Sequence, residues 1–152
     1  MTDFLVYDVF TDRPFGGNQL AIVPNAAELP EERLQVIARE FNFSESVFLY
    51  PPESAGVAKV RIFTPTMEVP FAGHPVIGTV VMLGEAGLGP DFVLELGVGP
   101  MQVRAEAGRG SFTNEVALER LAEPENGLIA RALGTPEATI VGQPVMAGVG
   151  LA

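Results

Sequence analysis

The stretch "PVIGTVVML" at residues 75–83 decides the fold. Its large apolar residues fall around the whole circumference of a helix, and Gly78 and Thr79 fill the remaining arc. A helix that is apolar on every side is buried on every side. Such a helix is about 13 Å long, which is too short to cross a membrane. The pattern therefore predicts a helix at the centre of the domain.

Short apolar segments on both sides of this helix are typical of strands. They cover residues 4–10, 19–23, 46–50, 58–64, 92–96, 101–107 and 138–146. Further helices are predicted at 30–41, which is amphipathic, and at 125–134. Because strands precede and follow the apolar helix, we expect a curved mixed β-sheet or barrel wrapped around it, which is an α+β fold.

The composition excludes several classes of partner. Hydrophobic residues make up 47% of the 152 residues and charged ones 18%, which predicts a packed core rather than disorder. The net charge of −10 would repel phosphate backbones and anionic membrane surfaces. We therefore expect neither a nucleic-acid partner nor a membrane partner.

The chain has no cysteine, so a disulfide framework and thiol catalysis are excluded. No cluster has the spacing of a structural zinc site, and no glycine motif matches a dinucleotide or phosphate loop. The N-terminus lacks the basic flank and cleavage site of a signal peptide. We expect a cytoplasmic protein that uses no metal and no cofactor.

His74 is the only histidine, and it stands between Gly73 and Pro75 at the start of the apolar helix. Proline suits a first helical turn, since its missing N–H would have been unpaired there. The free amides and the dipole at such a helix start favour an anion, and Gly73 lets a ligand approach the backbone. His74 either contacts such a ligand or caps a buried helix with no ligand.

Glu45 lies in "FNFSESVF", between the amphipathic helix and the next strand. Neighbouring phenylalanines would partly desolvate its carboxylate, which would bring its pKa toward the range useful for acid–base chemistry. The alternative is an exposed glutamate in a helix-to-strand turn. Asn18 follows two glycines, a context typical of a turn, and Glu68 is a polar residue of a loop.

Three segments taken together resemble the PhzF-like family, named after an isomerase of phenazine biosynthesis. They are "VYDVFTDRPFGGN", "AREFNFSES" and "RIFTPTMEVPFAGHPVIGT". The resemblance implies the fold of diaminopimelate epimerase, in which two similar domains face each other across the active-site cleft. It also implies that Glu45 is the acid/base and His74 an active-site residue, and that Asn18, Gly73 and Pro75 bind substrate.

The sequence departs from the family pattern in two places and in length. Gln19 stands where the family usually has proline, and Val76 stands where it usually has threonine. The resemblance implies one PhzF-like domain over 1–137, with 138–152 as the first strand of a second, truncated domain. A half-length protein that forms a homodimer is the alternative.

The leading hypothesis is an isomerase that shifts a proton on a small carboxylate-bearing substrate without a cofactor. A carboxylate-based epimerase is less favoured, because epimerases of this fold use two cysteines and this chain has none. A hypothesis of another class is a non-catalytic half-domain that acts in binding or assembly, since a one-sided site lacks its opposing wall.

Overall fold

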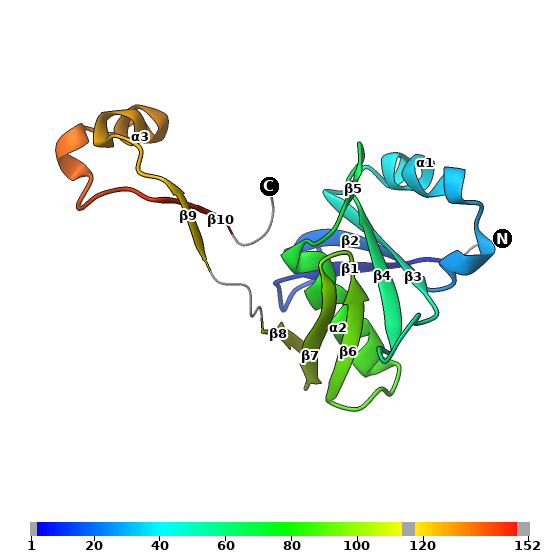
Figure 1. Ribbon diagram of the computed structural model, residues 1–152. Helices are drawn as coiled ribbons and strands as arrows, with labels where there is room; N and C mark the ends of the chain where they lie inside the picture. The colour runs from blue at the N-terminus through cyan, green and yellow to red at the C-terminus, as the bar shows by residue number, and fades with distance from the viewer. Residues whose placement is uncertain (1–2, 114–117, 149–152) are drawn as a thin grey trace. The chain divides into compact units, whose positions relative to one another are not determined.

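A computed structural model of the chain describes residues 3–113 and 118–148 (Figure 1). Its internal contacts divide the chain into two units, Met1–Asn114 and Glu115–Ala152. The first unit holds the sheet, the central helix and every residue predicted to form the site. The predicted domain boundary at residue 137 stays a prediction. No helix among the described residues is long and apolar enough to span a bilayer.

Eight strands of the first unit form one mixed sheet. Their order is β1-β2-β3-β4-β6-β7-β8, with β5 paired to β4. The pairs β2–β3 and β4–β6 are parallel and the others are antiparallel. The strands are β1 (Leu5–Val9), β2 (Asn18–Val23), β3 (Glu45–Tyr50), β4 (Ala58–Phe63), β5 (Glu68–Val69), β6 (Asp91–Leu96), β7 (Gly99–Glu106) and β8 (Arg109–Phe112).

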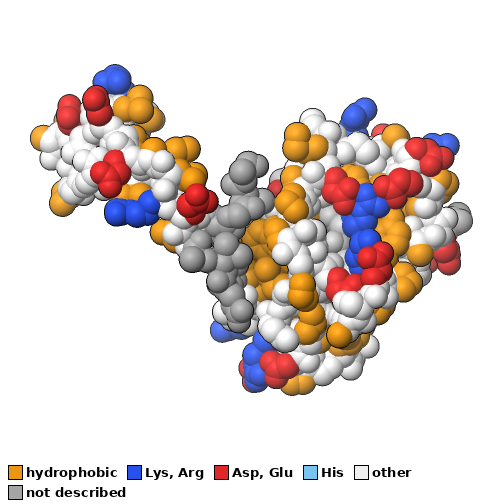
Figure 2. Space-filling model, in the orientation of Figure 1, with side chains coloured by type: hydrophobic (Ala, Val, Ile, Leu, Met, Phe, Trp, Pro, Cys, Tyr) orange, Lys and Arg blue, Asp and Glu red, His pale blue; other side chains and the backbone are white. Residues whose placement is uncertain are grey.

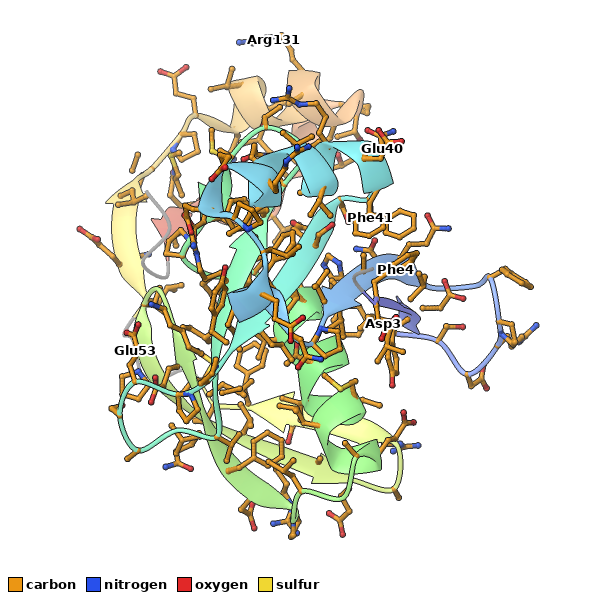
Figure 3. All side chains as sticks on the ribbon, turned by 90° about the vertical axis from the view of Figure 1, so that its right-hand side faces the viewer. Asp3, Phe4, Glu40, Phe41, Glu53 and Arg131 are labelled. Atoms are coloured by element: carbon orange, nitrogen blue, oxygen red, sulfur yellow. The ribbon has the colours of Figure 1, made fainter. Side chains whose placement is uncertain are left out.

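The sheet curls around helix α2 (Gly73–Glu85), which lies inside its curve (Figures 1 and 3). The side of the helix that carries Ile77 and Val81 is only partly buried, which departs from the predicted burial on every side. Most apolar residues on its other sides are buried. They pack against inward-facing side chains of β1–β4, β6 and β7 in one apolar cluster. The predicted α+β fold, a curved mixed sheet around a central buried helix, is confirmed.

Close packing of α2 against the sheet depends on a small residue. A Cβ built on Gly78 would lie 2.5 Å from Cδ2 of Leu20 and 3.0 Å from Cγ2 of Val9. Real Cβ atoms do not approach other atoms that closely, so any larger residue would push the helix away from β1 and β2. Gly78 therefore fixes the depth at which α2 sits in the sheet.

Helix α1 (Glu31–Phe41) covers the outer face of β3 and β4 and forms a second apolar cluster there. Leu34 and Ala38 of α1 are buried against Phe48 and Phe63, whose rings meet edge to face at 5.3 Å. In the alternation along β4, Phe63 shares a face with Lys59 and Arg61, and α1 buries it. Strand β3 is thus buried on both faces, whereas Lys59 and Arg61 on the α1 side of β4 are only partly buried.

A cleft of about 1050 Å³ lies between the two edge strands of the sheet. Its lining comes from β1, the turn before β8, and the side of α2 that contains Ile77 and Val81. Within it Tyr7 donates a hydrogen bond to Oε2 of Glu85 at 2.8 Å. The curled sheet is therefore open along one seam, and α2 is reached from solvent there.

The second unit contains α3 (Asn126–Leu133) and an antiparallel pair of short strands, β9 (Glu119–Ala122) and β10 (Met146–Gly148). The helix predicted at 125–134 is confirmed. The strand predicted over 138–146 is wrong for most of its length, because Glu137–Thr139 forms a 3₁₀ turn and only Met146 belongs to a strand. Pro144 explains part of this, since it has no N–H to donate to a ladder. The last predicted residues, 149–152, lie outside the described part of the chain.

Candidate functional site

Glu45 is the first residue of β3, and the end of α1 places it there. Asn42 ends α1 in the left-handed conformation, with φ at 53°, and donates its N–H to the carbonyl of Ala38. Asparagine tolerates this conformation better than most residues, so the chain turns sharply toward the sheet. Glu45 then pairs with Leu20 of the parallel strand β2, and its side chain is 20% exposed.

Aromatic rings support the segment between α1 and Glu45. Phe41 and Phe43 stack with ring centroids 6.1 Å apart, and Phe4 lies 4.8 Å from Phe41. Figure 3 shows Phe4 and Phe41 side by side at the end of α1. These rings pack on one another along the link that leads from α1 to Glu45, and the predicted desolvation of the carboxylate by phenylalanines stays a prediction.

His74 is the second residue of α2, and its side chain is 8% exposed. Its Nδ1 atom lies 3.4 Å from Oε2 of Glu45. The structure thus brings together the two residues that the sequence singled out, from a helix start and a strand start far apart in the chain.

Both members of this pair keep a buried polar atom without a partner. Among the described residues, Oε2 of Glu45 and Nε2 of His74 are buried and accept or donate no hydrogen bond. Buried polar atoms are nearly always paired, and an unpaired one needs an explanation. Oε2 of Glu45 lies 3.4 Å from Nδ1 of His74 without a hydrogen bond to it, so both side chains keep unused hydrogen-bonding capacity.

Burial lowers the pKa of His74 below its ordinary value, because it disfavours the charged imidazolium. The carboxylate of Glu45 and the backbone of Gln19 act in the opposite direction and are the smaller causes. The imidazole is therefore neutral near pH 7, with one nitrogen protonated and the other an acceptor.

Asn18 begins β2 and faces the same corner of the sheet. Its Oδ1 accepts a hydrogen bond from Oγ of Ser44 at 3.0 Å, and Ser44 immediately precedes Glu45. Sequence reasoning did not single out Ser44, although its position next to the candidate acid/base was a usable signal. This bond joins the start of β2, at Asn18, to the residue just before the start of β3, at Glu45.

The N-terminus of α2 is open. Ala72 provides no side-chain cap, the first turn contains no acidic residue, and a Cβ on Gly73 would meet nothing within 4 Å. The first amides of the helix therefore remain available to an anion beside His74. Pro75 lies in the same turn, but its side chain is fully buried, so it shapes the helix start from within the core.

The two departures from the family pattern occupy different environments. Val76 is fully buried in the core around α2, so a hydroxyl at this position would point into the apolar cluster. Gln19 has an exposed side chain next to Asn18, with its backbone near His74. Of the two, Gln19 is the one placed to contact a ligand.

The described residues contain no group of three His, Asp or Glu side chains arranged to hold a metal ion. The cleft beside Tyr7 is lined by none of the predicted site residues.

Comparison with known proteins places the chain in a family. The family described as phenazine biosynthesis-like protein, PhzC-PhzF, matches residues 7–141. An uncharacterized isomerase of Mesorhizobium japonicum is 43% identical over 127 residues, which are 80% of this chain and 42% of that protein. Trans-2,3-dihydro-3-hydroxyanthranilate isomerase of Pseudomonas fluorescens is 40% identical over 111 residues, 73% of this chain and 40% of that protein.

Solved structures agree with this assignment. The chain is similar to a PhzF-family phenazine biosynthesis protein of Bacillus anthracis, with a TM-score of 0.82 and 26% identity, covering 98% of this chain and 53% of that one. It is also similar to a predicted epimerase of Pseudomonas aeruginosa, with a TM-score of 0.81 and 31% identity, covering 99% and 57%. The chain spans about two fifths of the length of the curated relatives. It belongs to the phenazine biosynthesis-like, PhzC-PhzF, family.

Proposed function

We propose that the chain forms one wall of the active site of a cofactor-independent isomerase that shifts a proton within a small carboxylate-bearing molecule. The observation that carries this proposal is the pair of buried, unpartnered atoms, Oε2 of Glu45 and Nε2 of His74, beside an open helix start. A ligand that supplies a polar group to each atom and an anion to the helix would satisfy all three.

In this proposal Glu45 is the general base and then the general acid. Its carboxylate takes a proton from a carbon of the substrate, and the electron pair of the broken C–H bond moves into the conjugated system. Glu45 then returns the same proton to another carbon of that molecule, so atoms and charge balance. As the first residue of β3, paired with Leu20 of β2, it is held at one place in the sheet, which favours transfer between two nearby carbons.

His74 orients the substrate in this scheme. In this scheme the ring proton is on Nδ1, which lies 3.4 Å from Oε2 of Glu45 without a hydrogen bond to it. Nε2 then accepts a hydrogen bond from an N–H or O–H of the substrate. The lowered pKa keeps the ring neutral, so it does not compete with substrate as a cation beside Glu45.

The first amides of α2 bind the substrate carboxylate in this scheme. A helix N-terminus stabilises an anion through its free N–H groups and its dipole, and the space above Gly73 admits the group. Three relatives in Pseudomonas carry the name trans-2,3-dihydro-3-hydroxyanthranilate isomerase, which denotes a carboxylate substrate and an isomerisation. A molecule of this class is the substrate that we propose.

The opposing wall would come from polypeptide that the relatives carry beyond the matched part, or from a second copy of the chain. The matched parts amount to 42% and 40% of two curated relatives. A second candidate is a half-domain that binds a carboxylate without catalysis, for which the open start of α2 would suffice. Turnover separates the two candidates, because only the isomerase releases a rearranged product.

Glu45→Gln tests the proposal in the longest form of the protein that its gene encodes. Trans-2,3-dihydro-3-hydroxyanthranilate is incubated in deuterated water, and product formation and deuterium at carbon are followed by NMR. We expect the variant to lose about 100-fold or more in kcat, since positioned acid–base groups contribute about 10²–10⁴-fold. Glu40→Gln, an exposed change on α1, is the matched control.

Three outcomes separate the candidates. Wild-type turnover by the Glu45→Gln variant would overturn the assignment of Glu45. Deuterium at a single centre with inverted configuration and no moved double bond would indicate an epimerase instead. Carboxylate binding without turnover by the wild type would favour the binding half-domain.

A further inference from the structure

Arg61 of β4 joins three elements of the first unit through one guanidinium group. It binds Glu31 in the first turn of α1 by two hydrogen bonds, Nη1–Oε2 at 2.7 Å and Nη2–Oε1 at 2.8 Å. It binds Glu68 of β5 by two more, from Nε and Nη2, both at 2.7 Å. Its side chain is 19% exposed and lies against the rings of Tyr50 and Phe63. The guanidinium of Arg61 thus makes a two-bond contact with each carboxylate, which fixes the direction as well as the distance of Glu31 and Glu68.

The contact with α1 continues along one face of that helix. Glu31, Gln35 and Arg39 are spaced four residues apart, so they form one stripe. Nε2 of Gln35 donates to the carbonyl of Thr64 at 2.9 Å, and Nε of Arg39 donates to the carbonyl of Pro65 at 3.4 Å. Figure 2 shows the basic side chains flanked by acidic ones on the face that carries β4 and α1. We call Arg61 and this stripe the brace.

The turn held by the brace is itself closed by hydrogen bonds. The N–H of Thr64 bonds to the carbonyl of Met67 at 2.8 Å. Oγ1 of Thr64 accepts from the N–H groups of Thr66 at 3.2 Å and Met67 at 3.0 Å. These bonds close the turn of the β4–β5 hairpin. Helix α1 contacts this hairpin at strand β4, through Glu31, and at the turn, through Gln35 and Arg39.

Helix α1 and strand β5, which the brace joins, each lie just before a residue of the site in the chain. Helix α1 ends at Phe41, and Glu45 follows after a short link. Strand β5 ends at Val69, and His74 follows at the start of α2. A rotation of α1 against the hairpin would therefore change the separation of the two side chains.

We propose that Arg61 is a positioning residue that holds Glu45 and His74 at their working separation by locking α1 onto the β4–β5 hairpin. This inference rests on the proposed function of that pair. A partly buried ion network is weak support for stability, because desolvation offsets much of its attraction. Two planar two-bond contacts on one guanidinium instead fix the orientation of α1 relative to the β4–β5 hairpin. Proton transfer depends on such fixed positions of the acid–base group and the substrate.

The chain offers a matched control. Arg104 of β7 also binds two carboxylates, Asp91 at 2.8 Å and Glu106 at 3.2 Å. Its side chain is 47% exposed, and its partners lie on β6 and β7, from which no short link leads to Glu45 or His74. Arg104→Met thus removes a similar network without touching the brace.

The test compares Arg61→Met with Arg104→Met. Amide hydrogen exchange over residues 68–74 should accelerate about tenfold or more in Arg61→Met and stay within about twofold of wild type in Arg104→Met. The NMR signals of His74, the only histidine, should move in Arg61→Met alone. In turnover of trans-2,3-dihydro-3-hydroxyanthranilate by the longest encoded form, kcat should fall about tenfold or more with KM changed less than about threefold.

Arg61→Lys separates geometry from charge. Lysine keeps the positive charge but cannot form two planar forks, so it should restore folding yet leave most of the exchange and kcat defects. If Arg61→Met does not fold, Glu31→Gln removes one fork at an exposed carboxylate and should still accelerate exchange over 68–74. Full recovery by lysine, or exchange in Glu31→Gln equal to wild type, would overturn the proposal.

Failure of the brace and failure of the proposed function give different results. If exchange and the His74 signals in Arg61→Met match those in Arg104→Met, the brace is wrong, whatever the turnover. If exchange and the His74 signals change but kcat does not, the brace stands, and the catalytic role of the Glu45–His74 pair is wrong. The exchange and NMR measurements need no substrate.

Discussion

Nδ1 of His74 lies 3.4 Å from Oε2 of Glu45, although one residue begins the central helix and the other begins a strand of the surrounding sheet. The carboxylate of Glu45 acts on the pKa of His74, and this effect can be measured. Burial lowers the pKa of His74, and the carboxylate partly offsets that effect. The pair therefore reports on the site without any substrate.

The imidazole of His74 is expected to titrate below its ordinary pKa of 6.5. Replacing Glu45 by glutamine should lower this pKa further, because it removes the charge that favours the imidazolium. The measurement is the NMR titration of the single histidine in untagged protein. A pKa that stays the same or rises in Glu45→Gln would contradict the contact between the two side chains.

The same pKa makes folding stability depend on pH. Between the lowered pKa and 6.5 the unfolded chain binds a proton that the folded chain does not, so stability rises with pH across this window. The stability that the folded protein gains from a neutral His74 is fully present above pH 6.5. It is lost as the pH falls through the folded-state pKa of His74. Urea unfolding of the wild type and His74→Gln at a series of pH values checks this, and the variant should lack that component.

Much of the first unit could be predicted because its signals are local. The apolar circumference of residues 75–83 and the stripe of 30–41 each determine what a helix must bury, and both helices form within two residues of the predicted bounds. In β7 the apolar Met101 and Val103 are buried and the polar Gln102 between them is exposed, an alternation that is also a local signal. The pairing order of the strands carried no such local signal.

The site was predictable only in part, for a related reason. His74 and Glu45 stood out by chemistry and by resemblance, but Ser44, which bonds to Asn18, carries no signal apart from its neighbour. Glu68 was interpreted as a loop residue, because nothing in the sequence pairs it with Arg61 across the β4–β5 hairpin. Ion pairs between distant segments follow from tertiary packing, which a single sequence does not display.

Glu95 should act as an acid-sensitive anchor for the loop between β3 and β4. Its carboxylate accepts hydrogen bonds from Oγ of Ser54 and from the N–H groups of Glu53, Ser54 and Gly56, which lower its pKa to about 2. Figure 3 labels Glu53 on this loop. The ionised Glu95 carboxylate contributes its full stabilisation of the fold above pH 4.5, the ordinary pKa of glutamate. This stabilisation is lost as the pH falls toward the folded-state pKa of about 2.

Glu95→Gln therefore should accelerate amide exchange at Ser54 and Gly56 at neutral pH and remove that part of the acid dependence of unfolding. Glu40→Gln, on the exposed face of α1, is the control and should change neither. Equal protection of the loop amides in Glu95→Gln and wild type would show that the backbone alone holds the loop.

Tyr7 is expected to ionise only at high pH. Burial is the larger cause and the hydrogen bond to Glu85 the next, and together they raise its pKa to about 12. Glu85→Gln removes the charge but not the burial, so the pKa should fall part of the way toward 10. Ultraviolet titration of the tyrosinate signal checks this against Tyr7→Phe, since the chain has two tyrosines.

Gly78→Ala should destabilise the fold by about 1–3 kcal/mol, because the added methyl group overlaps Leu20 and Val9 in a packed core. Gly89→Ala is the matched control, since a Cβ there meets nothing within 4 Å. Urea unfolding measures both variants. A neutral Gly78→Ala would mean that α2 can withdraw from β1 and β2 at little cost, and the depth of the helix would then not be fixed by this residue.

Gly73→Ala separates binding from folding at the start of α2. The added methyl group meets no protein atom within 4 Å, and alanine is a better helix former than glycine, so stability should stay the same or rise slightly. The methyl group nevertheless occupies the space in which we place the substrate carboxylate, so carboxylate binding should weaken about tenfold or more. Calorimetric titration with anthranilate, alongside urea unfolding, measures the two effects on the same sample. Unchanged binding with unchanged stability would show that the carboxylate does not approach the first amides of α2, and the helix start would then have no part in recognition.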